Sequence, residues 1–142
     1  MTITFRAVVV AVAAAAAVLV VSAASTASAA DASFSVKVDA PAAKKAAPGK
    51  VHVHIAPGSG FHMNKDYPTS VTVVAPAGVT VEKAKLTAGD IKLVEAGADF
   101  DVSFTAADAG KKTFEGELKF AVCSATSCDP KKEKLSFVVE VK

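Results

Sequence analysis

The chain has 142 residues, 16 of them basic and 14 acidic, so its formal net charge at pH 7 is only +2. This even balance argues against a surface that binds nucleic acids or membranes electrostatically. The chain is long enough for one modest domain, and its two cysteines are too few for a disulfide-rich scaffold.

The first thirty residues have the pattern of a secretory signal peptide. One positive charge, Arg6, precedes an apolar run at 7–21, and the small residues at 27–29 fit the A-x-A cleavage pattern. The run is shorter than the ~18 residues of a membrane-spanning helix. We therefore expect a cleaved signal peptide at 1–30 and a periplasmic or secreted domain at 31–142, with no membrane attachment after cleavage. Without Arg6, the net charge of that domain is +1.

Apolar and polar residues alternate along most of 31–142, as in antiparallel strands with one solvated face. In chain order, the alternation predicts strands at 33–38, 51–55, 71–73, 79–81, 91–93, 100–105, 114–122 and 135–141. Proline and glycine clusters separate these segments at intervals of roughly 8–12 residues. Seven or eight such strands predict an all-β fold, an immunoglobulin-like antiparallel β-sandwich. Its expected core includes Phe34, Val36, Val53, Ile55, Val102, Phe104, Leu118, Phe120, Phe137 and Val139.

The two cysteines, Cys123 and Cys128, fall in the connection between the last two predicted strands. Cys123 has the parity of Lys119 and Glu117, so we expect it to point away from the core. Cys128 is expected in the loop. Both thiols should then be at least partly accessible, unlike those of inert buried cysteines.

Several kinds of site use two nearby cysteines. A structural disulfide here would close a ring of about six residues, which stabilises the fold by only ~2 kcal/mol in the chain-entropy model. A zinc site needs about four ligands, and no second cysteine pair or neighbouring histidine supplies them. A thioredoxin-type site has two intervening residues and a βαβ context, both absent from this pattern. A structural disulfide and a redox-active pair remain equally supported.

Two stretches resemble a known family. The segment VCSATSCDPKKEKLSFVVEV at 122–141 resembles the active-site hairpin in the amino-terminal periplasmic domain of the thiol–disulfide interchange protein DsbD. The segment APGSGFHMNKDYP at 56–68 resembles the region after an early strand of that domain. The resemblance implies a stand-alone relative with an immunoglobulin-like fold and no cofactor. In it, Cys123 and Cys128 would exchange electrons with periplasmic thiol and disulfide proteins. The family's typical spacing has one more residue between the cysteines.

In the redox interpretation, one thiolate attacks a partner disulfide and the other resolves the mixed disulfide. The sequence does not distinguish the two roles. Lys131 and Lys132 either favour the thiolate through their charge or are solvated loop residues. Phe61 and Tyr67 either belong to a loop that shields the pair or pack at one end of the sandwich.

All three histidines lie in the segment HVHIAPGSGFHM at 52–63. His52 and His54 share the outward face of one predicted strand, and His62 and Met63 follow. Imidazole and thioether ligands suit copper. A copper-binding exported β-sandwich is therefore an alternative function, against the simpler interpretation that these histidines occupy polar strand positions. An extracytoplasmic interaction domain with a purely structural disulfide is a further alternative.

Overall fold

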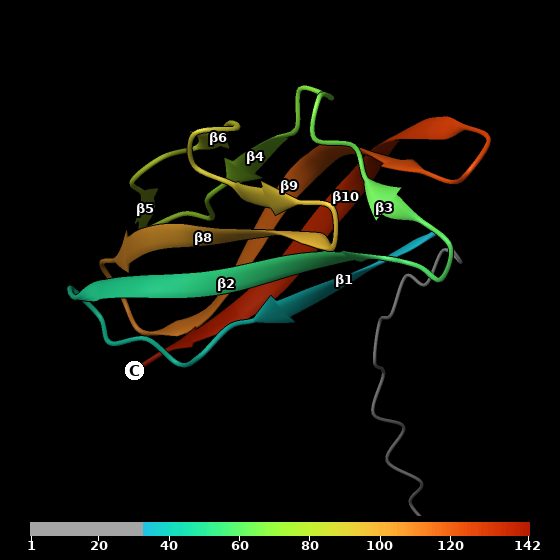
Figure 1. Cartoon of the computed structure of the whole chain (residues 1–142). Coiled ribbons are helices and arrows are strands. Elements are labelled where there is room, and N and C mark those ends of the chain that lie inside the picture. The colour runs from blue at the N-terminus through green and yellow to red at the C-terminus, as the bar shows by residue number, and fades with distance from the viewer. Residues whose placement is uncertain (1–32) are drawn as a thin grey trace, which may run out of the picture.

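A computed structural model describes residues 33–142, and its regular elements are strands (Figure 1). They are β1 (Phe34–Asp39), β2 (Pro48–Pro57), β3 (His62–Met63), β4 (Ser70–Val74), β5 (Val79–Val81), β6 (Lys85–Leu86), β7 (Lys92–Val94), β8 (Gly97–Ala106), β9 (Gly110–Cys123) and β10 (Cys128–Val141). The predicted signal peptide at 1–30 lies outside the described residues. Among the described residues, no helix has the length and apolar character needed to cross a membrane.

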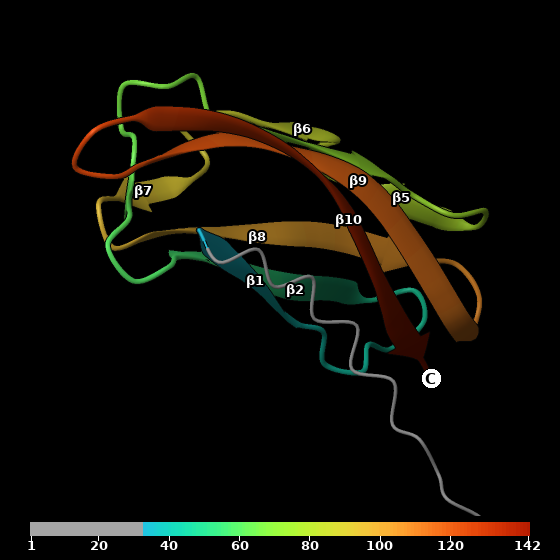
Figure 2. The ribbon, with the colours of Figure 1, turned by 90° about the vertical axis from the view of Figure 1, so that its right-hand side faces the viewer.

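The strands form two five-stranded sheets in which every pairing between strands is antiparallel. In the first sheet the order is β1-β2-β8-β5, and β7 also pairs with β8. In the second the order is β10-β9-β4-β6, and β3 also pairs with β9. Figure 2 shows β9 and β10 in one layer, with β1, β2 and β8 in the other. This arrangement confirms the predicted immunoglobulin-like antiparallel β-sandwich.

The described residues contain ten strands, whereas the sequence predicted seven or eight. Each of the eight predicted segments overlaps a strand. The two additional strands, β3 and β6, have two residues each, which is too short for period-two alternation to reveal them. The omission of β3 matters, because this strand pairs with the end of β9 that carries Cys123.

The core between the sheets is built largely from the predicted alternating residues. Nine of the ten expected core residues are buried. Val36 is only half-buried, because β1 is an edge strand that pairs with β2 alone. Aromatic contacts join the layers: the ring centroids of Phe104 and Phe114 lie 5.0 Å apart, as do those of Phe34 and Phe120. Burial of these rings stabilises the sandwich and fixes the spacing of its sheets.

Strands β9 and β10 form the longest hairpin of the described chain. They pair over 14 positions, from Cys128 opposite Cys123 to Val141 opposite Gly110. In Figure 1 the closed end of this hairpin projects at the upper right, next to β3. Both cysteines therefore lie at one tip of the sandwich.

Candidate functional site

Cys123 and Cys128 form a disulfide at the closed end of the β9–β10 hairpin. Cys123 is the last residue of β9 and Cys128 is the first of β10, and the two are direct cross-strand partners with Cα atoms 3.9 Å apart. The sequence predicted both residues within the connection, but they end the strands and leave residues 124–127 as the loop. The disulfide therefore clamps two positions that the strand register already brings together.

The loop at 124–127 is ordered by its own side chains. The backbone N–H of Ser124 donates to the carbonyl oxygen of Ser127 at 2.7 Å. The hydroxyl oxygen of Ser124 accepts from the backbone N–H groups of Thr126 and Ser127 at 3.3 and 3.2 Å. A serine hydroxyl that satisfies nearby backbone donors is a common way to stabilise a tight turn. The exposed loop thus holds Cys128 in a defined position.

The two halves of the disulfide differ in exposure. Cys128 is exposed, whereas Cys123 is only 4% exposed. The prediction that both cysteines would be accessible is therefore wrong for Cys123. Strand parity does place Cys123 on the side of Lys119, but at this end of β9 Cys123 is flanked by Cys128 of β10 on one side and by β3 on the other. The disulfide is therefore open to solvent on the side of Cys128.

The segment that flanks Cys123 begins with the two-residue strand β3. His62 lies opposite Cys123, and Met63 lies opposite Val122. The next residue, Asn64, donates its backbone N–H to the carbonyl oxygen of Ala121 at 2.9 Å. The Met63 side chain is buried and anchors the segment. The segment therefore extends the second sheet beside the disulfide.

A tight turn directs the chain from β2 into β3. The backbone N–H of Phe61 donates to the carbonyl oxygen of Gly58 at 3.0 Å, and Gly60 has a φ of 80°. This is the φ that the third residue of a type II turn requires, and glycine adopts it without steric cost. This turn thus positions His62 beside β9.

A shallow hollow of about 310 Å³ adjoins the disulfide. It is lined by His62, Met63, Asn64, Lys65, Asp66, Glu95, Cys123 and Cys128. An ion pair crosses it, with Lys65 Nζ 3.3 Å from Glu95 Oε1. The hollow therefore presents polar and charged groups around a disulfide that is open to solvent on one side.

The sequence also raised two lysines and two aromatic residues as candidates near the cysteines, and the structure shows the surroundings of each. Lys131 Nζ lies 5.9 Å from the ring centroid of Phe34, and Lys132 Nζ lies 3.4 Å from Glu117 Oε2. Phe61 is half-buried and packs against the core, as the packing interpretation predicted. Tyr67 is also half-buried. The ion pair of Lys132 with Glu117 favours its interpretation as a surface charge.

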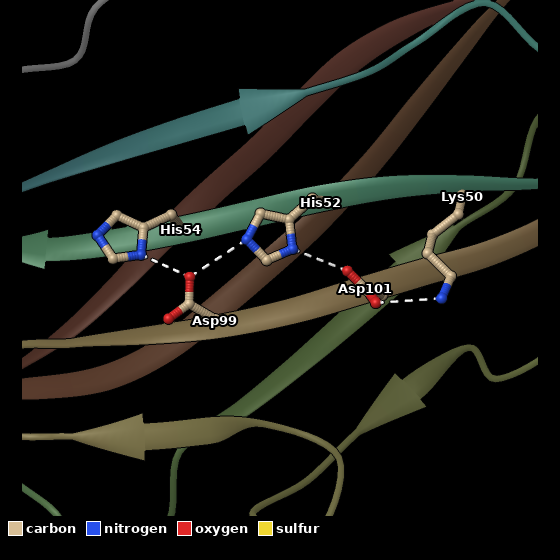
Figure 3. Close-up of polar contacts among 5 residues, drawn as sticks. All are labelled: Lys50, His52, His54, Asp99 and Asp101. Carbon is tan, nitrogen blue, oxygen red and sulfur yellow. Dashed lines mark hydrogen bonds and ion pairs between the residues drawn. The ribbon is translucent and has the colours of Figure 1, made fainter.

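A second polar cluster lies on the outer face of the first sheet (Figure 3). The register of β2 and β8 places His52 opposite Asp101 and His54 opposite Asp99. His52 Nδ1 is 2.8 Å from Asp101 Oδ1, and its Nε2 is 3.2 Å from Asp99 Oδ1. Lys50 Nζ lies 3.3 Å from Asp101 Oδ2. Both ring nitrogens of His52 thus face carboxylate oxygens, which only accept hydrogen bonds, so this arrangement fits the protonated ring.

The charges in this cluster shift one another's pKa values. The hydrogen bond that His52 donates to the Asp101 carboxylate is the main cause that raises the pKa of His52 above its ordinary value of 6.5. The same bond lowers the pKa of Asp101. Burial by itself raises the pKa of Asp99, but the hydrogen bonds and charges of His54 and His52 outweigh it and leave the pKa lowered. The cluster therefore favours charged histidine beside charged aspartate.

The four residues of the copper hypothesis do not form one group. His52 and His54 lie on β2 in the first sheet, whereas His62 lies on β3 in the second. Met63 is 1% exposed, with its side chain in the core. Within residues 33–142, no set of three histidine, cysteine, aspartate or glutamate side chains is arranged to hold a metal ion. The histidines of β2 bind aspartates instead.

Neither the aspartates beside His52 and His54 nor the residues beside the disulfide were predicted from the sequence. The D-x-D pattern of Asp99 and Asp101 has the same period as the H-x-H pattern of His52 and His54, and this shared period was a usable signal. No comparable signal linked His62 or Glu95 to the cysteines. Their proximity depends on β3 and on the hydrogen bond from Met63 N–H to the carbonyl oxygen of Glu95 at 2.9 Å.

Comparisons with known proteins give distant structural likenesses. No family model and no curated protein matches the chain. AggA, the major subunit of aggregative adherence fimbriae type I from Escherichia coli, is 9% identical with a TM-score of 0.41, over 77% of this chain and 94% of its own. A conjugative transposon lipoprotein from Bacteroides eggerthii is 13% identical with a TM-score of 0.42, over 77% and 98%. WR4, an MSP family member of C. elegans, is 12% identical with a TM-score of 0.37, over 75% and 94%. The function must therefore be argued from the site, and the resemblance to the DsbD domain stays a prediction.

Proposed function

We propose that this protein is an exported thiol–disulfide interchange domain that exchanges electrons with periplasmic or secreted thiol and disulfide proteins. The observation that carries the proposal is the unequal exposure of its disulfide. Cys128 is exposed on an ordered hairpin tip, and Cys123 is buried beside it. This arrangement gives an attackable sulfur and a protected resolving sulfur, which is the division of labour that exchange requires.

The exchange proceeds in two displacements. A partner thiolate attacks Cys128 Sγ, the bond between Cys128 and Cys123 breaks, and the electron pair of that bond leaves on Cys123 as a thiolate. A second thiolate of the partner then attacks the partner's own sulfur in the mixed disulfide and releases Cys128 as a thiolate. The partner is oxidised by two electrons and this protein is reduced by two. The reverse sequence reduces a partner disulfide, with Cys128 as the attacking residue.

A stabilising role alone accounts poorly for the position of the disulfide. The 14-residue pairing of β9 and β10 already holds the two cysteine positions opposite each other. The closed ring is short, so its contribution in the chain-entropy model is about 2 kcal/mol. Disulfides that are exposed on short loops are also among those most readily reduced.

The proposed compartment follows from two features. The pattern of residues 1–30 predicts export. The chain also carries a disulfide, and disulfides persist in oxidising compartments such as the periplasm or the extracellular space. Proteins with disulfides, which the proposed exchange needs as partners, occur in the same compartments.

The test combines a redox titration with a trapping experiment. The purified domain is equilibrated with glutathione buffers of graded potential, quenched with an alkylating reagent and weighed by mass spectrometry. We expect coexisting oxidised and reduced protein at potentials above about −300 mV, where structural disulfides stay oxidised. We also expect Cys123→Ser, which retains only the exposed cysteine, to accumulate mixed disulfides with exported proteins. Cys128→Ser is the matched control and should accumulate far fewer.

A disulfide that resists glutathione throughout the series, together with equal trapping by the two variants, would contradict the proposal. That outcome would leave an interaction domain whose disulfide is structural.

A further inference from the structure

Three residues form a row across the second sheet at the disulfide. Cys128 on β10 pairs with Cys123 on β9, and His62 on β3 pairs with the other side of Cys123. Directly opposite residues in an antiparallel sheet project to the same face with Cβ atoms about 4.5–5.5 Å apart. All three side chains line the hollow beside the disulfide. The exposed imidazole of His62 is therefore the cross-strand neighbour of the buried sulfur.

The other charged residues that line the hollow are not placed directly opposite Cys123. Lys65 and Asp66 follow β3, and Glu95 comes from the turn between β7 and β8. Lys65 is engaged with Glu95 at 3.3 Å. Asp66 carries a negative charge, which disfavours a neighbouring thiolate. Among the groups that line the hollow, His62 alone combines a positive form with a position in register with Cys123.

The geometry points to His62 as the residue that stabilises Cys123 as the leaving thiolate when a partner opens the disulfide. This role rests on the proposed exchange function and adds a specific residue to it. Burial raises the free energy of a thiolate, and a nearby imidazolium lowers it. Because histidine is the side chain that most often changes charge in the physiological pH range, the role is tested at two pH values.

His62 takes part in the first displacement without gaining or losing a proton. The partner thiolate bonds to Cys128 Sγ, and the electron pair of the broken bond moves to Cys123 Sγ. The imidazolium of His62 keeps its proton and pairs with the new thiolate. With the proton on the ring, Cys123 stays a thiolate and can attack the mixed disulfide in the return step. A lower thiol pKa of the leaving group makes its departure faster.

The first measurement is the rate at which reduced glutathione opens the disulfide in the full domain. His62→Gln removes the charge, and His62→Lys retains a positive charge at every pH used. The matched control is His54→Gln, the same change in the first sheet. We expect His62→Gln to open about three- to tenfold more slowly than the wild type at about pH 6, and less so at about pH 8.5. His62→Lys and the control should stay within about twofold of the wild type at pH 6. The ratio of variant to wild-type rates removes the pH dependence of glutathione itself.

The second measurement detects the Cys123 thiolate directly. In the Cys128→Ser background Cys123 is the only thiol, and its ionisation is followed by ultraviolet absorbance. The chain has no tryptophan and one tyrosine, so this signal is favourable. We expect His62→Gln to move the titration midpoint of Cys123 to higher pH, while His54→Gln leaves it in place. Far-UV spectra of all variants check that the sandwich is intact.

Two outcomes would overturn the role of His62. One is that His62→Gln leaves both the opening rate and the Cys123 midpoint at their wild-type values. The other is that His62→Lys behaves like His62→Gln, which would mean that the positive charge is not what matters. Failure of the exchange function is distinguishable, because the Cys128→Ser variant still reports the midpoint of Cys123 when the wild-type domain does not react with glutathione.

Discussion

His54 and Asp99 face each other across β2 and β8, with Nδ1 of the histidine 2.7 Å from Oδ1 of the aspartate. The same carboxylate oxygen also lies 3.2 Å from His52 Nε2 (Figure 3). One aspartate thus serves two histidines on the outer face of the first sheet. This sharing makes the cluster sensitive to pH, and it engages both ring nitrogens of His52 and Nδ1 of His54 with carboxylate oxygens.

The first prediction concerns the pH dependence of stability. The raised pKa of His52 contributes stability that is present below its ordinary value of 6.5 and is lost as pH rises through the folded-state pKa. The lowered pKa values of Asp99 and Asp101 contribute stability that is present above 3.8 and is lost as pH falls through their folded-state values. The contribution of the cluster is therefore largest between these two limits.

Thermal unfolding at about pH 5.5 and about pH 8.5 checks this prediction. The His52 side chain is 49% exposed, so the expected gain at the lower pH is at most about 1 kcal/mol. His52→Gln should remove this gain, while Ser103→Ala, a change without a titrating group on the same strand as Asp101, should retain it. Equal pH profiles for the wild type and His52→Gln would contradict the assignment.

The second prediction concerns copper. His52 and His54 already bind carboxylates, and His62 lies in the other sheet. Any copper taken up by β2 should therefore bind weakly and be lost in the double variant His52→Ala with His54→Ala. His62→Ala should leave it unchanged. Calorimetric titration measures both effects, and tight binding that requires His62 would restore the copper hypothesis in its original form.

The third prediction concerns the stability that the disulfide supplies. The double variant Cys123→Ala with Cys128→Ala should lose about 2 kcal/mol from the short ring, together with a smaller loss from the buried side chain of Cys123. It should still unfold cooperatively, because the β9–β10 pairing persists along the hairpin. Denaturant titration of this variant against the oxidised wild type gives the difference. Complete loss of folding would instead favour a structural role for the disulfide.

The fourth prediction concerns Gly116 on β9. A side-chain carbon at this position would collide with the backbone carbonyl oxygen of Thr72 on the neighbouring strand β4. Gly116→Ala should therefore destabilise the fold by about 1–3 kcal/mol, because the two strands must separate locally. Gly89→Ala is the matched control, since no atom lies within 4 Å of its added carbon. Equal unfolding midpoints for the two variants would refute the close approach.

The sequence by itself determined the class of fold and most of its core. Residues such as Val53, Ile55, Leu118 and Phe120 alternate with polar neighbours, and this alternation fixes which side of a strand is buried. The hairpin that carries the cysteines was also predictable, because two strong strand patterns flank a short connection. Parity assigned the correct face to Cys123, but parity says nothing about what covers that face.

The tertiary structure alone decided the surroundings of the disulfide and the fate of the histidines. β3 has two residues, too few for a periodic signal, and yet it pairs with the end of β9 and places His62 beside the buried Cys123. His52 and His54 are two residues from each other, whereas Asp99 and Asp101 are more than forty residues away and meet them only through the register of β2 and β8. Local alternation depends on the chemistry of neighbouring residues. The pairing of distant strands and its register depend on how the whole chain packs. They cannot be derived from the local pattern of a single sequence.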